Sequence, residues 1–143
     1  MLGSESRTPP SLWPRSTRNG ALSDKYRSWS DCDGQVERRF SKDQLLTTLA
    51  LYWFAQAMPS AIRLYWEIRQ RPLQFGRGQR VDVPVAVAHF PRELPIPPRH
   101  YVERVFNVRR WTELERGGHF AALEEPQALA EDIRLFAASL RVG

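Results

Sequence analysis

The sequence has 143 residues, which is enough for one ordinary domain with a hydrophobic core. Its composition, 42% hydrophobic and 11% aromatic, is globular rather than disordered, and the single Cys32 excludes an internal disulfide and a zinc ribbon. The net charge of +5 comes from arginines scattered among acids, without a basic stripe or a repeated aromatic-basic array, so we expect no nucleic-acid partner.

The first 23 residues differ from the rest of the chain. They are rich in Ser, Pro, Arg and Gly and have no hydrophobic periodicity, so we predict a disordered tail there. No apolar run in the sequence approaches the roughly 20 residues that are needed to cross a bilayer. We therefore expect no transmembrane segment in this chain and a cytoplasmic location.

Two helices are predicted in the first half of the chain. Residues 24–40 are rich in turn formers, and we expect a loop there. Ser41 and Gln44 follow it with the spacing of a capping box, in which each side chain bonds the backbone N–H of the other residue. The box predicts a helix over residues 41–56, with Leu and aromatic side chains at helical spacing. A second helix is expected over residues 60–69, just after a proline.

The pattern changes in the second half of the chain. Residues 83–90 form a short apolar run that is typical of a strand buried on both faces of a parallel sheet. A proline-rich turn (91–98), a helix (98–106), a second strand (108–114) and a closing helix (126–140) are expected after it. This order indicates an α/β fold with a βαβα unit. Because two parallel strands leave long edges unpaired, we interpret the chain as a fragment of a larger sheet.

Two polar residues are expected at the carboxyl edge of this sheet, where open α/β sheets carry their functional sites. Glu93 follows the first predicted strand and His119 follows the second, so their side chains can meet. A carboxylate beside an imidazole orients the ring and stabilises its charged form. The alternative is that both are solvated turn residues, and the spacing leaves this open. His89 and His100 are weaker candidates, and no two His have the spacing of a metal site.

Tyr65 lies in the second predicted helix and has two interpretations. On an amphipathic helix, an aromatic side chain usually packs into the core. A Tyr hydroxyl can also hydrogen-bond a substrate oxygen and act as a general acid. The spacing of the residues does not decide between these two roles.

Four blocks of the sequence match one known family in order and spacing. They are KYRSWSDCDGQVERRFSKDQLLTTLALYW (25–53), RLYWE (63–67), HFPREL (89–94) and RGGHFAALEEPQALAEDIRLF (116–136). They resemble the lid, lid-tyrosine, acid and catalytic-histidine segments of epoxide hydrolases of the microsomal type, which are α/β-hydrolases with a helical lid. The resemblance covers roughly residues 22–141.

The resemblance implies the C-terminal part of an α/β-hydrolase, in which residues 24–78 belong to the helical lid and residues 79–143 form the last βαβα part of the core. It implies that His119 is the proton acceptor, that Glu93 is the acid orienting it, and that Tyr65 is a proton donor to the epoxide oxygen. The family forms vicinal diols through an ester on an Asp within a Gly-Gly-Asp-Trp type motif. This sequence contains no such motif, so we expect the chain alone to be inactive.

The same resemblance implies an epoxide as the substrate of the complete protein, and neither a cofactor nor a metal ion. A homo-oligomer is a further expectation. Two alternatives stay open. One is another lidded α/β-hydrolase such as a haloalkane dehalogenase, although that family uses a halide-binding Trp or Asn rather than lid tyrosines, so Tyr65 argues against it. The other is a non-enzymatic remnant that binds a partner through its open sheet edge.

Overall fold

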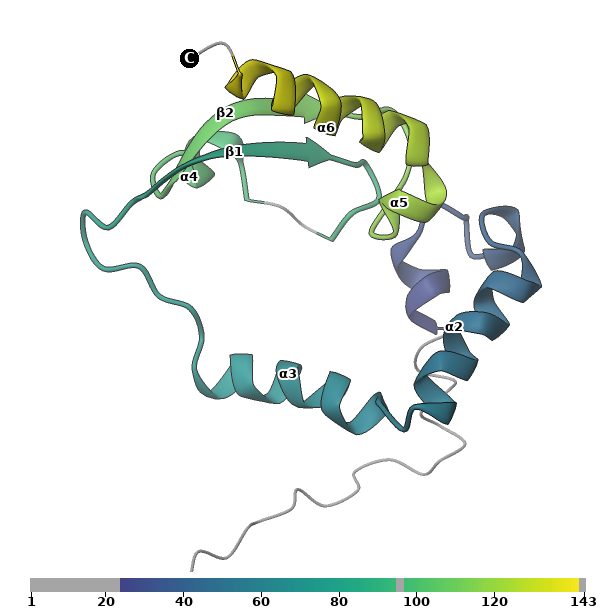
Figure 1. The fold of residues 1–143 in the computed structure, drawn as a ribbon. Coiled ribbons are helices and arrows are strands. Elements are labelled where there is room, and N and C mark those ends of the chain that lie inside the picture. Colours follow the sequence, from purple (N-terminus) through teal and green to yellow (C-terminus); the bar gives the residue numbers. More distant parts are fainter. Residues whose placement is uncertain (1–23, 95–96, 142–143) are drawn as a thin grey trace, which may run out of the picture.

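The computed structural model describes residues 24–94 and 97–141. The predicted tail and two residues of the predicted proline-rich turn lie outside these ranges. In the described residues, the chain forms a two-stranded sheet with one long helix on it and a pair of helices that extends away from it (Figure 1). The elements are η1 (Val36–Arg38), α2 (Lys42–Phe54), α3 (Met58–Gln70), β1 (Val81–His89), α4 (Arg99–Val102), β2 (Phe106–Glu113), α5 (Ala121–Glu124) and α6 (Pro126–Leu140).

The segment before α2 is more ordered than the sequence indicated. Residues 24–29 are helical and η1 is a 3₁₀ turn, so the predicted loop is wrong at both places. So short a helix is not stable alone in water and takes its stability from tertiary packing. The packing comes from Tyr26, whose buried ring stacks on Phe120, with the ring centroids 4.1 Å apart and the planes at 9°. This partner is far away in the sequence, and no local pattern reveals it.

The helices α2 and α3 are confirmed, with slightly different bounds. Ser41 and Gln44 form the predicted capping box: Gln44 N donates to Ser41 Oγ at 3.1 Å, and Ser41 N donates to Gln44 Oε1 at 2.8 Å. α3 begins at Met58 and takes Pro59 into its first turn. Of the helices in residues 24–94 and 97–141, none alone is long and apolar enough to cross a membrane. α2 and α3 together pass this test by length and composition, but they meet at a bend of 87°.

The two predicted strands pair in parallel, from Val81 opposite Phe106 to His89 opposite Glu113, with two irregularities in the register. α4 is shorter than the predicted helix, since residues 103–105 form a turn before β2 begins at Phe106. α6 begins at the predicted proline and covers one face of the sheet (Figure 1). The buried Asp132 joins the two layers. Both donors to its Oδ1 come from β2, each at 2.6 Å: Arg110 Nε and Thr112 Oγ1.

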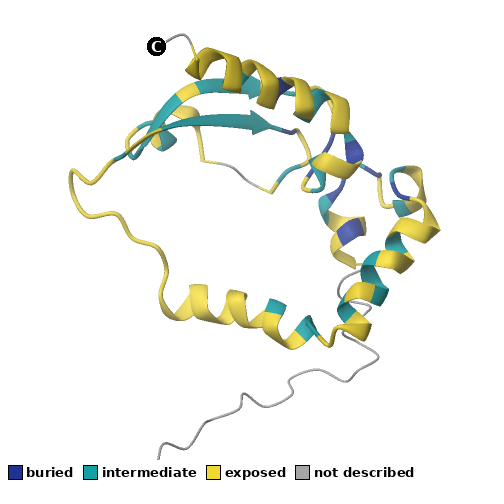
Figure 2. Ribbon diagram, in the orientation of Figure 1, coloured by how far each residue is buried: buried dark blue, intermediate teal, exposed yellow. Residues whose placement is uncertain are grey.

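The buried hydrophobic side chains do not lie beneath the middle of the sheet. They gather where residues 24–40 meet the end of β1 and the chain around α5, as the dark blue segments in Figure 2 show. In the described residues this small core consists of Tyr26, Cys32, Phe40 and Phe90. The sheet edge at which the two candidate residues were predicted is therefore also where the chain is best packed.

Candidate active site

The ends of β1 and β2 stay together beyond the last strand residues. Arg92 N donates to Gly117 O at 3.0 Å, and Arg92 forms an isolated parallel bridge with Gly118. A tight turn then follows β1, in which Glu93 N donates to Phe90 O at 3.1 Å. The loops that follow the two strands therefore leave the sheet side by side. Glu93 lies in the first loop and His119 in the second, and their side chains face each other.

The predicted contact between Glu93 and His119 is confirmed. His119 Nδ1 lies 2.8 Å from Glu93 Oε1, and the same oxygen accepts the N–H of Leu94 at 2.6 Å. A carboxylate oxygen only accepts, so we assign a proton to Nδ1. The neutral ring then presents Nε2 as a proton acceptor. Among the residues that the structure describes, none hydrogen-bonds Nε2, and 38% of the His119 side chain is exposed.

His119 is also held through its main chain and by two aromatic rings. Its N–H donates to Trp29 O at 2.9 Å. The Trp29 ring lies against the imidazole with centroids 5.0 Å apart and planes at 75°, and Phe120 lies against it at 5.2 Å and 87°. The imidazole therefore has contacts on more than one side in addition to the Glu93 hydrogen bond.

The two glycines before His119 allow this close approach. A Cβ on Gly118 would lie 2.6 Å from Trp29 O, a distance at which the backbone must move. Gly117 has a φ of +101°, and a Cβ there would lie 2.8 Å from a ring carbon of Phe90. Both positions are buried against residues 29–31 and the end of β1.

A half-buried charge network fixes the same loop from the side. Asp31 Oδ2 accepts Gly117 N at 3.1 Å and Arg39 Nη2 at 2.9 Å, and Arg39 Nη1 donates to Glu125 Oε1 at 2.9 Å. The N–H of Gly117, followed by the charges of Arg39 and Arg92, keeps the pKa of Asp31 below its ordinary value despite burial. Sequence reasoning missed this network, because it treated Asp31 as a turn former.

Glu124 adds a second connection between the early segment and the His119 loop. Its Oε2 accepts Asp31 N at 2.7 Å, and its Oε1 accepts Phe120 N at 3.0 Å. The side chain is buried, and these backbone N–H groups offset the cost of burying a carboxylate. No signal in the sequence distinguishes Glu124 from the acids around it, because one of its partners is 93 residues away.

No family model matches the chain. Epoxide hydrolase 1 of Sus scrofa is 36% identical over 122 residues, 79% of this chain and 27% of the relative. The crystal structure of juvenile hormone epoxide hydrolase from Bombyx mori superposes with a TM-score of 0.71 at 26% identity, over 88% of this chain and 37% of that one. An enantioselective mutant of the Aspergillus niger epoxide hydrolase gives a TM-score of 0.67 at 28% identity, over 90% and 34%.

The chain is thus similar to the epoxide hydrolases. It matches the C-terminal part of these proteins and spans about a quarter of the length of the curated relatives. The fold is accordingly α/β, with helices and a small parallel sheet that match the C-terminal part of an α/β-hydrolase. The predicted fold class is confirmed.

Tyr65, the third predicted site residue, stands apart from the other two. It lies on α3, which is separate from the sheet in Figure 1, and the residue is 62% exposed. Among the described residues, no hydrogen bond joins Tyr65 to His119 or Glu93. The structure thus brings together the acid and the imidazole but not the phenol.

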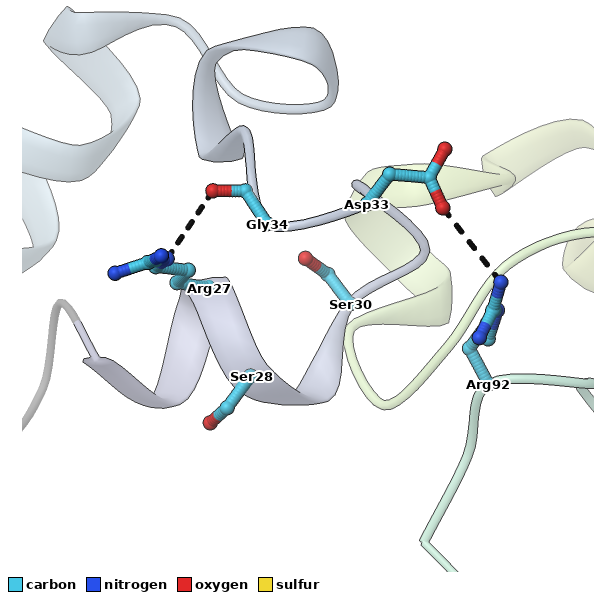
Figure 3. Close-up of a pocket in the computed structure, with 6 residues that line it drawn as sticks. All are labelled: Arg27, Ser28, Ser30, Asp33, Gly34 and Arg92. Carbon is cyan, nitrogen blue, oxygen red and sulfur yellow. Dashed lines mark hydrogen bonds and ion pairs between the residues drawn. The ribbon is translucent and has the colours of Figure 1, made fainter.

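A small hollow of about 180 Å³ is lined by residues of helix 24–29 and of the turn after it, together with Arg92 (Figure 3). Arg27 Nε donates across it to Gly34 O at 3.1 Å, and Arg92 lies 3.6 Å from Asp33. None of the three predicted site residues lines it. Nor does any group of three or more His, Cys, Asp or Glu in residues 24–94 and 97–141 form a metal site. The lining residues are Arg27, Ser28, Ser30, Asp33, Gly34 and Arg92.

Proposed function

We propose that this chain supplies the water-activating part of an epoxide hydrolase active site. His119 is the general base, and Glu93 is the acid that orients it and stabilises its charged form. The observation that supports the proposal is the 2.8 Å contact between His119 Nδ1 and Glu93 Oε1 at the carboxyl ends of two adjacent parallel strands. In this arrangement, Nε2 is available to accept a proton from water.

The proposed reaction has two steps. An Asp carboxylate, for which this sequence has no matching motif, attacks an epoxide carbon, the C–O bond of the ring breaks, and an ester forms. His119 Nε2 then takes a proton from water as the hydroxide adds to the ester carbonyl. The imidazolium, stabilised by Glu93, returns the proton to the departing diol oxygen. The new carboxylic acid then releases its proton, which makes up for the one given to the epoxide oxygen in the first step, and the nucleophilic carboxylate is regenerated.

Tyr65 belongs to the first of these steps in the proposal. Its hydroxyl would donate to the epoxide oxygen while that oxygen gains negative charge. Support comes from the RLYWE block and from the exposure of the side chain, because a phenol packed in a core is not free to reach a substrate. On this assignment Tyr65 governs ester formation, and His119 governs ester hydrolysis.

Two preparations test the proposal. The chain alone, incubated with styrene oxide, is expected to form no diol above the buffer rate. A chimera in which the chain replaces the matching C-terminal part of the Sus scrofa enzyme is expected to turn over. In the chimera, His119→Ala and Glu93→Gln should lower turnover about 10²- to 10⁴-fold and let the ester accumulate. Tyr65→Phe should instead slow ester formation.

The control is His89→Ala, because this chain holds a second His–carboxylate pair, His89 with Glu113, at the same strand ends. That variant should keep the turnover of the chimera. Diol formation by the isolated chain that disappears in His119→Ala would contradict the expected inactivity. A chimera in which His119→Ala leaves the rate of ester hydrolysis unchanged would refute the role of His119.

A further inference from the structure

Trp29 contacts His119 at two independent points. Its main-chain carbonyl accepts the His119 N–H at 2.9 Å, and its indole ring lies edge to face with the imidazole, 5.0 Å between centroids and at 75°. The Lys25 ammonium lies over the same indole, 4.2 Å from its centroid. Neither the hydrogen bond to Glu93 nor the packing of the core requires an indole at this position.

We propose that Trp29 is a positioning residue that holds the imidazole of His119 in the orientation in which Nδ1 donates to Glu93. The proposal rests on the proposed function, because orientation matters only if His119 is the base. A single hydrogen bond fixes one ring atom, and the ring can still tilt about it. At a site with 38% of the side chain exposed, water also competes for Nδ1. A ring packed against the imidazole limits its tilt and also keeps water away from Nδ1.

The indole can do this because its own support is rigid. Trp29 ends the helix of residues 24–29, whose Tyr26 is buried and stacks on Phe120. The next residue, Ser30, is buried, and its hydroxyl donates to Tyr26 O. Phe120 in turn flanks the imidazole from the loop side. The indole and His119 therefore share one packed support, and a shift of one relative to the other would disturb buried groups.

The molecule provides its own comparison. His89 Nδ1 lies 2.5 Å from Glu113 Oε2, and Trp111 is near that imidazole as well, with centroids 6.2 Å apart. In that pair, the indole Nε1 of Trp111 donates to Glu113 Oε1 at 2.6 Å. Both His–carboxylate pairs lie at the ends of the same two strands. A substitution that alters the tautomers of both His89 and His119 therefore acts through the sheet, whereas one that alters only His119 acts locally.

The test is the tautomer of each imidazole in the ¹⁵N-labelled chain, measured from the ¹⁵N shifts of Nδ1 and Nε2 above the pH at which histidine titrates. Trp29→Leu keeps an apolar side chain but no ring, and Trp29→Phe keeps a ring. In the Leu variant, the ratio of the Nδ1–H to the Nε2–H form of His119 should fall about two- to tenfold, the worth of an aromatic pair. In the Phe variant it should stay within about twofold of the wild type.

An unchanged ratio in Trp29→Leu would overturn the proposal. So would equal losses in the Leu and Phe variants, and so would a parallel change at His89, since each would mean that the ring itself does not orient His119. The measurement uses no epoxide and no nucleophile. The tautomer test can therefore refute the role of Trp29 while His119 still acts as the base in the chimera. Conversely, a chimera whose turnover does not depend on His119 would refute the proposed function without changing the measured tautomer ratio.

Discussion

Single atoms decide how the His119 loop is held. The missing Cβ of Gly118 lets Trp29 O come close enough to accept the His119 N–H, and the N–H of Gly117 is free to reach Asp31. In each case a residue near the start of the described chain supports the loop that carries the proposed base. The loop is held by close backbone contacts and hydrogen bonds rather than by a large buried apolar surface. Its stability should therefore be sensitive to the addition of a single methyl group.

Gly118→Ala is expected to destabilise the chain by about 1–3 kcal/mol, because the added methyl group would lie 2.6 Å from a backbone oxygen. Gly76→Ala is the matched control. A Cβ there meets only the flexible side chain of Gln79, at 3.4 Å, and the free energy of unfolding should change by less than about 0.5 kcal/mol. Urea denaturation of the two variants checks this, and equal midpoints would contradict it.

Asp31 makes the stability of the loop depend on pH. Its carboxyl has a lowered pKa in the folded chain, mainly through the Gly117 N–H and then through Arg39. A lowered pKa means that the stabilisation is complete above the unfolded pKa of about 3.9 and is lost as the pH falls through the folded value. Asp31→Asn should cost about 1–2 kcal/mol at pH 7 and progressively less below about pH 4.

Urea denaturation of the wild type and of Asp31→Asn at pH 7, 5 and 3 measures that difference directly. Arg39 stays charged over this whole range, so only the carboxyl side of the pair titrates. A difference between the two proteins that stays constant from pH 7 to pH 3 would show that the Asp31 charge contributes nothing to the loop.

At the scale of elements, the sequence was most informative where the signal is local. The capping box at Ser41 and the proline that starts α6 act within one helical turn, so both helix starts were predictable. The contact of Glu93 with His119 was predictable as well, since neighbouring parallel strands end at one edge. Helix 24–29 was not, because its stability comes from an aromatic ring that follows both strands in the sequence.

The contrast between local and long-range signals also explains why the roles of Asp31, Arg39 and Glu124 were not predicted. Asp31 meets Gly117 across 86 residues and Glu124 across 93, and Arg39 meets Glu125 across 86. No window of a few residues contains both members of any of these pairs. Such contacts follow from the fold as a whole, and a single sequence carries no pattern for them.

The attachment of α6 to the sheet should depend on one carboxylate. Asp132 is buried and accepts from Arg110 and Thr112, so Asp132→Ala leaves two donors without their acceptor beneath the helix. We expect a loss of about 2–3 kcal/mol in the free energy of unfolding. Glu131→Ala, one position earlier, removes an exposed pair with Arg134 and should leave the urea midpoint almost unchanged. Equal effects of the two variants would refute this assignment.

At the scale of the whole molecule, apolar side chains are concentrated on the outside of the helix pair α2 and α3, which Figure 2 shows mostly as exposed. Many exposed apolar side chains on one pair of helices favour association with other apolar surface. The exposed large hydrophobic residues of the pair are Leu46, Leu51, Trp53, Phe54, Ile62, Leu64, Tyr65, Trp66 and Ile68. An isolated chain with such a surface should not remain monomeric at high concentration.

We therefore expect the chain to self-associate in sedimentation velocity experiments. The double change Phe54→Gln and Leu64→Gln, at positions 82% and 58% exposed, should raise the dissociation constant about tenfold or more. Ile133→Gln is the control, because Ile133 is also 58% exposed but lies on α6. A monomer at every concentration, or the same effect from the control, would contradict the assignment of the associating surface to α2 and α3.

The aromatic cluster of Tyr26, Phe40 and Phe120 also limits the order in which the protein can fold. Phe120 is separated from the other two residues by most of the described chain. A large loop must therefore close, at a cost in entropy, before burial of these rings can stabilise the fold. During translation, the helix of residues 24–29 has no partner until the ribosome has released Phe120. We therefore expect the chain to fold late and cooperatively, and a nascent chain stalled before α5 to present its aromatic rings to chaperones.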